Sequence, residues 1–242
     1  MNRIPPFLER MRGLYSDAQI QRLLNAHVLI AGLGGVGGYA AEALARAGTG
    51  AFTLIDGDKV EISNINRQLL ALHSTTGKSK AALMAERIKD INPQARVEVI
   101  DRFMEPGDFE KLFDTSFDYV VDAIDSLSPK IYLITEAMKR GLPLISVMGS
   151  GGKKDPSKIR VADISETRDD FFARMVRKRL KKHGIRKGFK AVFSTELQDK
   201  AALVKQEDMP YKKSAYGTVS YMPAIFGMTA AAEVIRALAG EA

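Results

Sequence analysis

The stretch VLIAGLGGVGGYAAEALARAGTGAFTLIDGDKV, residues 28–60, is the clearest indication of the fold class. It contains an apolar run, the turn GLGGVG at 32–37, an alanine-rich segment and a second apolar run that ends in Asp56-Gly57-Asp58. Glycines between a strand and a helix let the backbone approach a phosphate, and the helix N-terminus favours its negative charge. The stretch therefore predicts a strand–helix–strand unit that holds a nucleotide at its glycine-rich turn.

Apolar and amphipathic segments alternate along the first 150 residues. The pattern predicts strands at 28–33, 51–55, 96–100, 118–124 and 142–147, and helices at 36–47, 78–91, 108–113 and 129–140. Such alternation is typical of an α/β protein, here a Rossmann-like, doubly wound and mostly parallel sheet. Ligands of such sheets bind beyond the carboxyl ends of the strands, where the glycine turn, Asp56 and Asp125 all fall.

The alternation weakens beyond Gly152, although one domain over 1–242 remains the prediction. We expect an N-terminal helical arm at 1–27, a nucleotide-binding core at 28–152, and a substrate and dimer region at 153–242. The arm should hold a helix from Ser16 to about Leu24, which a capping box begins. The last region should hold strands at 159–164 and 191–195, helices at 169–182 and 223–239, and an irregular segment at 198–217.

The composition excludes several chemistries. The chain contains no cysteine and only three histidines, which removes disulfides, thiolate zinc sites and cysteine nucleophiles and disfavours a histidine metal site. The longest apolar runs are too short to cross a membrane, and the N-terminus has no apolar signal core. We therefore expect a cytoplasmic protein without a membrane partner.

The doubled acid after the second strand distinguishes this site from an ordinary NAD site. Asp56 is placed to bind ribose hydroxyls, as in many dinucleotide-binding folds. Asp58 and Asp125 add carboxylates, and Arg67 and Lys80 add cations. Such a set suggests a nucleoside triphosphate with Mg²⁺, whose charge the cations stabilise as pyrophosphate leaves. Each residue taken alone is also compatible with a solvated charge or a local salt bridge, which is the favoured interpretation for nearby Lys78.

One segment carries the excess of positive charge. The net charge of +7 comes from 36 basic and 29 acidic residues, and residues 165–190 alone hold ten Lys or Arg against three acids. This concentration predicts an RNA-binding surface, and a solvated helix face is the alternative. The candidate RNA-binding residues are Arg174, Arg177, Lys178, Lys181, Lys182, Arg186 and Lys187, with Lys190 beyond them. Phe171 or Phe172 is a candidate for stacking on a base, with core packing the favoured expectation.

Four motifs resemble the adenylating superfamily of ubiquitin-activating-type enzymes, with its ThiF, MoeB and HesA members. They are GLGGVGG, LIDGDKVEISNINRQ, GKSKA and VVDAIDS. The resemblance implies catalytic roles for Arg67, Lys80, Asp125 and Arg10, with Asp125 as the metal ligand. It implies a nucleotide site built from Gly32, Gly34, Gly35, Val36, Gly37, Asp56, Asp58, Asn64, Gln68 and Ser126. Arg10, or alternatively Arg12, would reach into the site of a partner subunit, which implies a homodimer.

The chain departs from the branch of this superfamily that adenylates carrier proteins. It lacks the CxxC pairs, and Ser126 stands where that branch usually has asparagine. DAIDS, VFSTE, the basic segment and the proline-led C-terminal helix instead resemble tRNA threonylcarbamoyladenosine dehydratases. That branch implies ATP and Mg²⁺ as cofactors and a tRNA substrate whose carboxylate is activated as an acyl-adenylate. The substrate itself supplies the nucleophile, so no protein cysteine is needed.

Three other functions stay open from the sequence. One is an adenylyltransferase for a ubiquitin-like sulfur carrier, with a cysteine desulfurase or another sulfur acceptor as the candidate partner. The second is an NAD(P)-dependent oxidoreductase, in which the pair of Arg67 and Lys80 would be incidental. The third is a nucleotide-binding scaffold without turnover.

Overall fold

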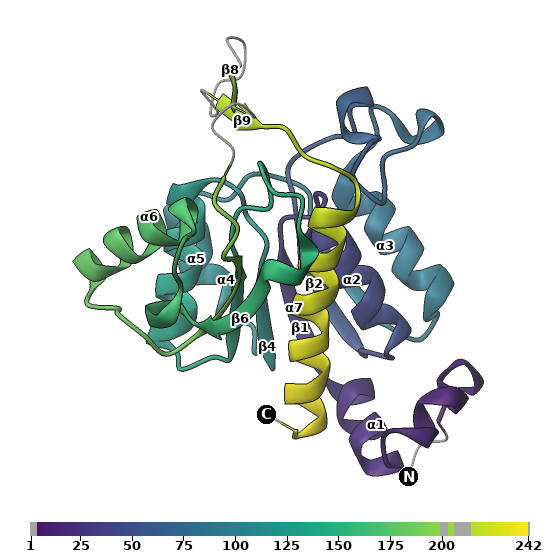
Figure 1. The fold of residues 1–242 in the computed structure, drawn as a ribbon. Helices are drawn as coiled ribbons and strands as arrows, with labels where there is room; N and C mark the ends of the chain where they lie inside the picture. The colour runs from purple at the N-terminus through teal and green to yellow at the C-terminus, as the bar shows by residue number, and fades with distance from the viewer. Residues whose placement is uncertain (1–3, 199–202, 206–213, 242) are drawn as a thin grey trace.

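A seven-stranded sheet organises the chain, whose computed structural model describes residues 4–198, 203–205 and 214–241 (Figure 1). The strands are β1 (His27–Ala31), β2 (Ala51–Ile55), β3 (Arg96–Ile100), β4 (Tyr119–Asp122), β5 (Leu144–Val147), β6 (Ile159–Asp163) and β7 (Lys190–Ser194). Their order is β3-β2-β1-β4-β5-β7-β6, and only the β6–β7 pair is antiparallel. The predicted α/β fold class and mostly parallel sheet are confirmed.

Helices cover both faces of the sheet. The helices are α1 (Asp17–Asn25), α2 (Gly37–Arg46), α3 (Lys80–Ile91), α4 (Pro106–Leu112), α5 (Leu127–Lys139), α6 (Phe171–Leu180) and α7 (Tyr221–Ala239). Helix α1 belongs to the N-terminal arm, and α2–α7 cover the two faces. Successive residues of β1 point to opposite faces, with Val28 and Ile30 in one apolar cluster and Leu29 and Ala31 in the other. Helices α2, α3 and α7 contribute to the first cluster, and α4, α5 and α6 to the second. Burial of both faces explains why the central strands are continuously apolar.

The sequence located β1–β7 and α1–α7 to within two residues, and the differences have local causes. Helix α5 begins at Leu127 rather than at 129, and Pro129 sits in its first turn. Helix α6 is shorter than predicted, because Asp170 caps its start with a bond from the Ala173 amide at 2.9 Å and a 3₁₀ turn follows at Lys181–His183.

The prediction of irregular structure over 198–217 was wrong in part. Strands β8 (Leu203–Lys205) and β9 (Ser214–Tyr216) pair in antiparallel fashion as a separate two-stranded sheet. Residues 199–202 and 206–213 of that segment lie outside the described residues.

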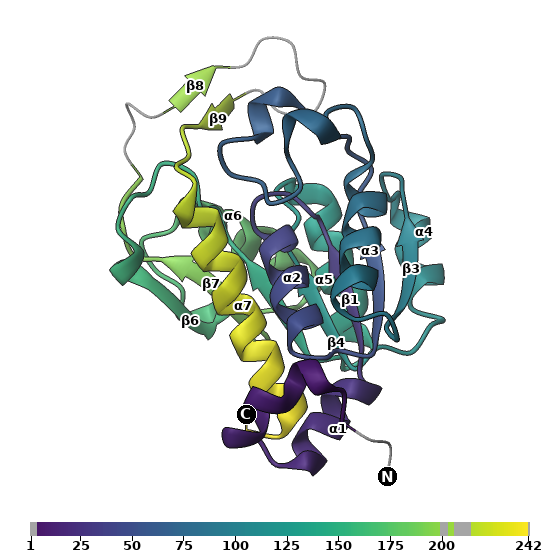
Figure 2. The same ribbon diagram turned by 90° about the vertical axis from the view of Figure 1, so that its right-hand side faces the viewer.

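Helix α7 has the length and apolar composition of a membrane span. It lies alongside α2 in both views of the ribbon (Figure 1 and Figure 2). Its residues Phe226, Ala230 and Val234 are buried in the core. A Cβ atom at Gly227 would overlap the carbonyl oxygen of Val36, so the two helices are in backbone contact. Packing against α2 and the sheet accounts for the apolar character of α7.

The N-terminal arm lies at the amino ends of the strands. A 3₁₀ helix, η1 (Pro6–Gly13), precedes α1, and the buried Leu8 packs against Gly48 just before β2. The capping box predicted at Ser16 is confirmed, with the Gln19 amide donating to the Ser16 hydroxyl and the Ser16 amide donating to the Gln19 side chain. The arm is therefore at the opposite edge of the sheet from the glycine-rich turn.

Candidate nucleotide-binding site

The glycine-rich turn lies at the point where the strand order reverses. Strands β1 and β4 are neighbours, and the chain proceeds outward from them in opposite directions. Gly32 has φ +88°, and a Cβ atom there would be 2.7 Å from the carbonyl oxygen of Ala123. The loops after β1 and β4 are therefore in contact, which places Asp125 at the same edge as the turn. Open α/β sheets bind ligands in the crevice at this switch point.

The turn forms a cradle into which a helix N-terminus points. Helix α2 begins at Gly37, where a Cβ atom would overlap the carbonyl oxygen of Gly32, so only glycine allows this tight turn. No side chain caps the first turn of α2, since its N-cap residue is Val36. The Gly38 amide donates to the Gly34 carbonyl at 3.1 Å, and the helix N-terminus is otherwise open to an anion.

Two residues predicted to contact phosphate lie over this cradle. The backbone of Arg67 approaches Gly35, and the amide of Gln68 lies next to Gly34. The Gln68 Oε1 atom is buried and has no hydrogen-bond partner within the described residues. Buried polar atoms are rarely left without a partner, so this amide fits a ligand-binding position. The Oε1 atom is an acceptor and suits a ligand hydroxyl or amino group, while the Gln68 Nε2 group beside Gly34 is the donor that suits a phosphate.

Asp56 connects the cradle to the loop after β2. Its two carboxylate oxygens accept the Leu33 amide at 2.6 Å and the Asp58 amide at 2.8 Å. Burial raises the pKa of Asp56, while the charge of Lys80 and the two amides act in the opposite direction. The carboxylate is therefore fixed at the end of β2, where it retains lone pairs for ribose hydroxyls.

The two predicted cations are held in place by neighbours. Lys80, the first residue of α3, is 4% exposed, and its Nζ lies 2.9 Å from a carboxylate oxygen of Asp58. The guanidinium of Arg67 donates to the Ser63 carbonyl at 2.8 Å and to Asn66 Oδ1 at 2.9 Å. Asp58 therefore orients the buried ammonium, which is a second use of the doubled acid.

The structure gives Asn64 a supporting position in its own turn. Its Oδ1 accepts the Glu61 amide at 3.2 Å, and its Nδ2 donates to the Ser63 hydroxyl at 3.3 Å. This side chain is buried and stabilises the turn that presents Arg67. Its predicted phosphate contact stays a prediction.

A buried ion pair that the sequence reasoning missed lies beneath Asp125. Lys130 Nζ on α5 is 2.6 Å from a carboxylate oxygen of Asp122 at the end of β4, and Ser146 donates to the same oxygen at 2.5 Å. The other oxygen accepts the Ile124 amide at 3.1 Å, so Asp122 braces the turn that leads to Asp125. Burial raises the pKa of Asp122 and lowers that of Lys130. An acid inside the apolar run VVDAI was the signal for this pair.

Asp125 is exposed at the start of α5, with the Ser126 hydroxyl 3.4 Å from one of its oxygens. Within the described residues no three His, Cys, Asp or Glu side chains are grouped as metal ligands. Mg²⁺ in nucleotide sites is usually held by one or two carboxylates, substrate phosphates and waters. The position of Asp125 beside the cradle fits that kind of site.

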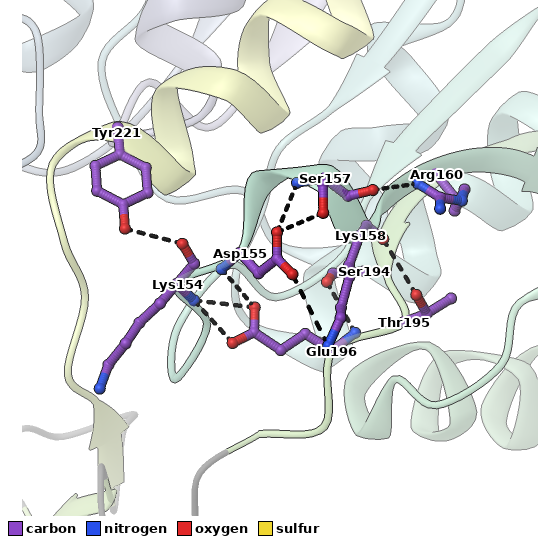
Figure 3. A network of polar contacts seen from close by, with 9 residues as sticks. All are labelled: Lys154, Asp155, Ser157, Lys158, Arg160, Ser194, Thr195, Glu196 and Tyr221. Atoms are coloured by element: carbon purple, nitrogen blue, oxygen red, sulfur yellow. Dashed lines mark hydrogen bonds and ion pairs between the residues drawn. The ribbon is translucent and has the colours of Figure 1, made fainter.

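A second glycine-rich loop, residues 149–155, follows β5 at the same edge. Figure 3 shows Glu196 accepting the amides of Lys154 and Asp155, at 2.9 Å each, while the Tyr221 hydroxyl donates to the Lys154 carbonyl. The buried ammonium of Lys153 pairs with Asp170 at the start of α6. The loop is thus tied to β7, α6 and α7, and the sequence reasoning did not anticipate these contacts.

The predicted basic surface is largely exposed, with two corrections. Arg177 was expected to point outward but is half-buried, and it donates to the Thr167 carbonyl at 2.9 Å. Lys190 forms an ion pair with Glu233 on α7 at 2.8 Å. The exposed cations of residues 165–190 are Arg168, Arg174, Lys178, Arg179, Lys181, Lys182, Arg186 and Lys187, of which Arg168 and Arg179 were not predicted.

Arg10 is not brought near the cradle of its own chain. It lies on η1, at the amino ends of the strands, and forms no ion pair with any described residue. Arg12 instead donates to both carboxylate oxygens of Asp17, at 2.9 and 3.0 Å. Of the two arginines, Arg10 is therefore the one whose guanidinium is available to another chain.

Fold and site together define a nucleotide-binding α/β protein with clustered cations and carboxylates at its switch point. The chain belongs to the ThiF family, which it matches over residues 8–242. This confirms the resemblance found in the sequence motifs.

Two relatives and one solved structure carry the name tRNA threonylcarbamoyladenosine dehydratase. The tRNA threonylcarbamoyladenosine dehydratase of Bacillus subtilis is 46% identical over 190 residues, with 78% of this chain and 73% of that protein covered. That of Escherichia coli is 38% identical, with 95% and 92% covered. The crystal structure of the Escherichia coli enzyme in complex with ATP has a TM-score of 0.88 and 37% identity, with 98% and 97% covered. The function predicted from the sequence is the one these relatives carry.

A relative from the carrier-protein branch matches less of the chain. The adenylyltransferase and sulfurtransferase of Aspergillus niger is 35% identical over 125 residues, which covers 52% of this chain and 26% of that protein.

Proposed function

We propose that this protein cyclises N6-threonylcarbamoyladenosine beside the anticodon of tRNA, in an ATP-dependent dehydration through an acyl-adenylate. The main support for the proposal is that three features of the site lie at the same edge of the sheet. These are the phosphate cradle, the ion pair of Lys80 and Asp58, and Asp125 at the start of α5. The names of the relatives support the substrate.

In this proposal the cradle and Asp56 bind ATP, and Arg67 and Lys80 face its phosphates. The threonyl carboxylate of the substrate attacks the α-phosphorus, an acyl-adenylate forms and pyrophosphate leaves. Lys80 and Arg67 would stabilise the charge that develops on the phosphates. Mg²⁺, held by Asp125, would neutralise phosphate charge when bound.

The second half of the reaction needs no nucleophile from the protein. The carbamoyl group attacks the activated acyl carbon, the bond to AMP breaks and one proton is released. The nucleoside loses the elements of one water, while ATP is converted to AMP and pyrophosphate. A chain without cysteine is compatible with this chemistry, because the nucleophile belongs to the substrate.

The exposed cations of α6 and the segment after it form the proposed tRNA surface. Helix α6 packs beside α5, which begins next to Asp125 at the candidate nucleotide-binding site, here called the activation site. Phosphate neutralisation by such residues would dominate the affinity for tRNA.

Other parts of the proposal concern assembly and location. Arg10 would act in the site of a second subunit, so the working form would be a homodimer. We also propose a cytoplasmic location, where tRNA and ATP are available. In the alternative of carrier-protein adenylation, a sulfur-acceptor protein or cysteine desulfurase would be the partner, since this chain has no thiol of its own.

The test is direct. The purified protein is incubated with ATP, Mg²⁺ and tRNA that carries threonylcarbamoyladenosine, and the nucleosides are read by mass spectrometry under conditions that keep the ring closed. We expect an ATP-dependent loss of one water mass. ATP binding without any mass change, together with carrier-dependent exchange of pyrophosphate into ATP, would favour the alternative.

A further inference from the structure

A basic, partly apolar hollow lies beside the activation site. It forms where the outer face of α6 meets the start of α5, and no acidic side chain among the described residues lines it. Its apolar lining is Leu127, Phe171 and Met175, and its cations include Arg174, Lys178 and Lys182. Leu127 is two residues beyond Asp125, so the hollow begins at the rim of the proposed active site.

Phe171 is the unusual member of this lining. Core packing was the expectation for both phenylalanines, and it is wrong for Phe171, which is 50% exposed. Phe172 does pack against the core and lies 5.8 Å from the Lys130 ammonium. The guanidinium of Arg174 sits 5.0 Å from the centre of the Phe171 ring. An exposed ring and a planar guanidinium together form a platform on which a flat group can stack.

We propose that this hollow binds an unpaired nucleotide of the anticodon loop that neighbours the modified adenosine. The base stacks on the platform of Phe171 and Arg174, and Lys178 and Lys182 contact its flanking phosphates. Aromatic stacking accepts any base, because each has a π face, while nearby cations follow the backbone. The site would favour a splayed, single-stranded loop over a duplex. This inference rests on the proposed function and adds a specific subsite to it.

A double-mutant cycle tests the contact. The affinity of an anticodon stem-loop that carries the modified adenosine is measured for the wild type and for Phe171→Ala. Each measurement is repeated with RNAs that lack the base on the 5′ or the 3′ side of that adenosine. We expect Phe171→Ala to weaken the intact RNA roughly tenfold, as for one lost base–aromatic stack. For one of the two abasic RNAs, Phe171→Ala should cause no further loss of affinity. Phe171→Trp should restore the affinity for the intact RNA.

The control variant is Tyr132→Ala, which removes a similarly exposed aromatic ring from α5, 39% exposed, without touching the hollow. It should bind RNA as the wild type does. Additive losses for both abasic RNAs, or wild-type affinity in Phe171→Ala, would overturn the subsite. The subsite would also be overturned if a polyglutamate peptide competed for the protein as well as the stem-loop RNA does, because charge alone would then explain binding.

The two proposals fail separately. Water loss by the wild-type protein, read by mass spectrometry, reports on the dehydratase function without using Phe171. If the wild-type protein cyclises the nucleoside but the affinity losses in the double-mutant cycle are additive, only the stacking subsite is wrong.

Discussion

At the scale of single residues, the strand pattern of the sequence could predict which side chains gather at the candidate nucleotide site. Gly32, Asp56 and Asp125 each follow a strand, and parallel strands bring their carboxyl ends to one edge. The pairing of Asp122 with Lys130 could not be found this way. It joins a strand end to a helix interior, and only the packed fold makes the lysine an inward-facing residue.

The buried ammonium of Lys80 gives a prediction at this scale. Lys80→Met keeps the apolar stem and removes the charge, so kcat should fall about 10²- to 10³-fold if Lys80 stabilises the transferring phosphates. The matched control is Lys78→Met, two residues away and exposed, which should leave kcat unchanged. Turnover is measured as AMP released per enzyme, with Tm recorded for each variant. Wild-type turnover in a folded Lys80→Met protein would remove this residue from the phosphate site.

At the scale of elements, the boundaries of β2 and β3 agree with the sequence, since continuous apolar or alternating runs between turn residues determine them. The pairing of β8 with β9 was not predicted, because strands of three residues are too short to show a periodic pattern. Nor did the sequence show how α2 is joined to α3. Glu42 on α2, 6% exposed, accepts from Arg87 on α3 at 2.6 Å and from Arg46 at 2.7 Å.

This junction predicts a pH-dependent stability. Burial would raise the pKa of Glu42, but Arg87 and Arg46 more than offset it, and the net pKa is lowered. A lowered pKa in the folded state means that the stabilisation is present above the unfolded pKa near 4.5 and is lost as the pH falls through the folded value. Glu42→Gln should therefore cost about 1–2 kcal/mol at pH 7 and progressively less below pH ~4.5.

The free energy of unfolding is measured by denaturant titration across that pH range. Glu241→Gln is the control, since its ion pair with Arg236 is 3.9 Å long and exposed, and it should change stability by less than about 0.5 kcal/mol. If the loss in free energy of unfolding caused by Glu42→Gln stayed constant down to pH ~3, the ionised Glu42 side chain would not be the source of the stabilisation.

The basic helix makes a second prediction at the scale of elements. Reversal of Arg174, Lys178 and Lys181 to glutamate should weaken tRNA binding at least about 100-fold at low salt and flatten the dependence of affinity on salt. Reversal of Lys89 and Lys111, which are exposed on α3 and α4, is the control and should have little effect. Filter binding over a range of KCl concentrations measures both quantities. Unchanged affinity in the α6 variant would exclude this face from the tRNA site.

At the scale of the whole molecule, the arm and the activation site lie at opposite edges of the sheet (Figure 1). Arg10 therefore cannot complete its own site without a large movement of the arm. The sequence could suggest a second subunit only by resemblance, because no local pattern encodes contacts between chains.

Mixing two inactive variants tests this arrangement. Arg10→Ala and Lys80→Met should each be nearly inactive, yet one site of a mixed dimer contains both intact residues. An equal mixture should recover about a quarter of wild-type activity if dimers assort randomly. Light scattering must show that each variant dimerises like the wild type. Failure of well-formed mixed dimers to recover activity would show that Arg10 does not act in trans.

The contact of α7 with the cradle also has a consequence for synthesis on the ribosome. Pro223 packs against Gly35, and Gly227 touches the backbone at Val36, so the phosphate cradle is completed by a helix that is translated long after it. A nascent chain that stops before α7 exposes the apolar surface of α2 and holds an unfinished cradle. We expect interrupted translation to yield fragments that proteases remove, rather than fragments that consume ATP without modifying tRNA.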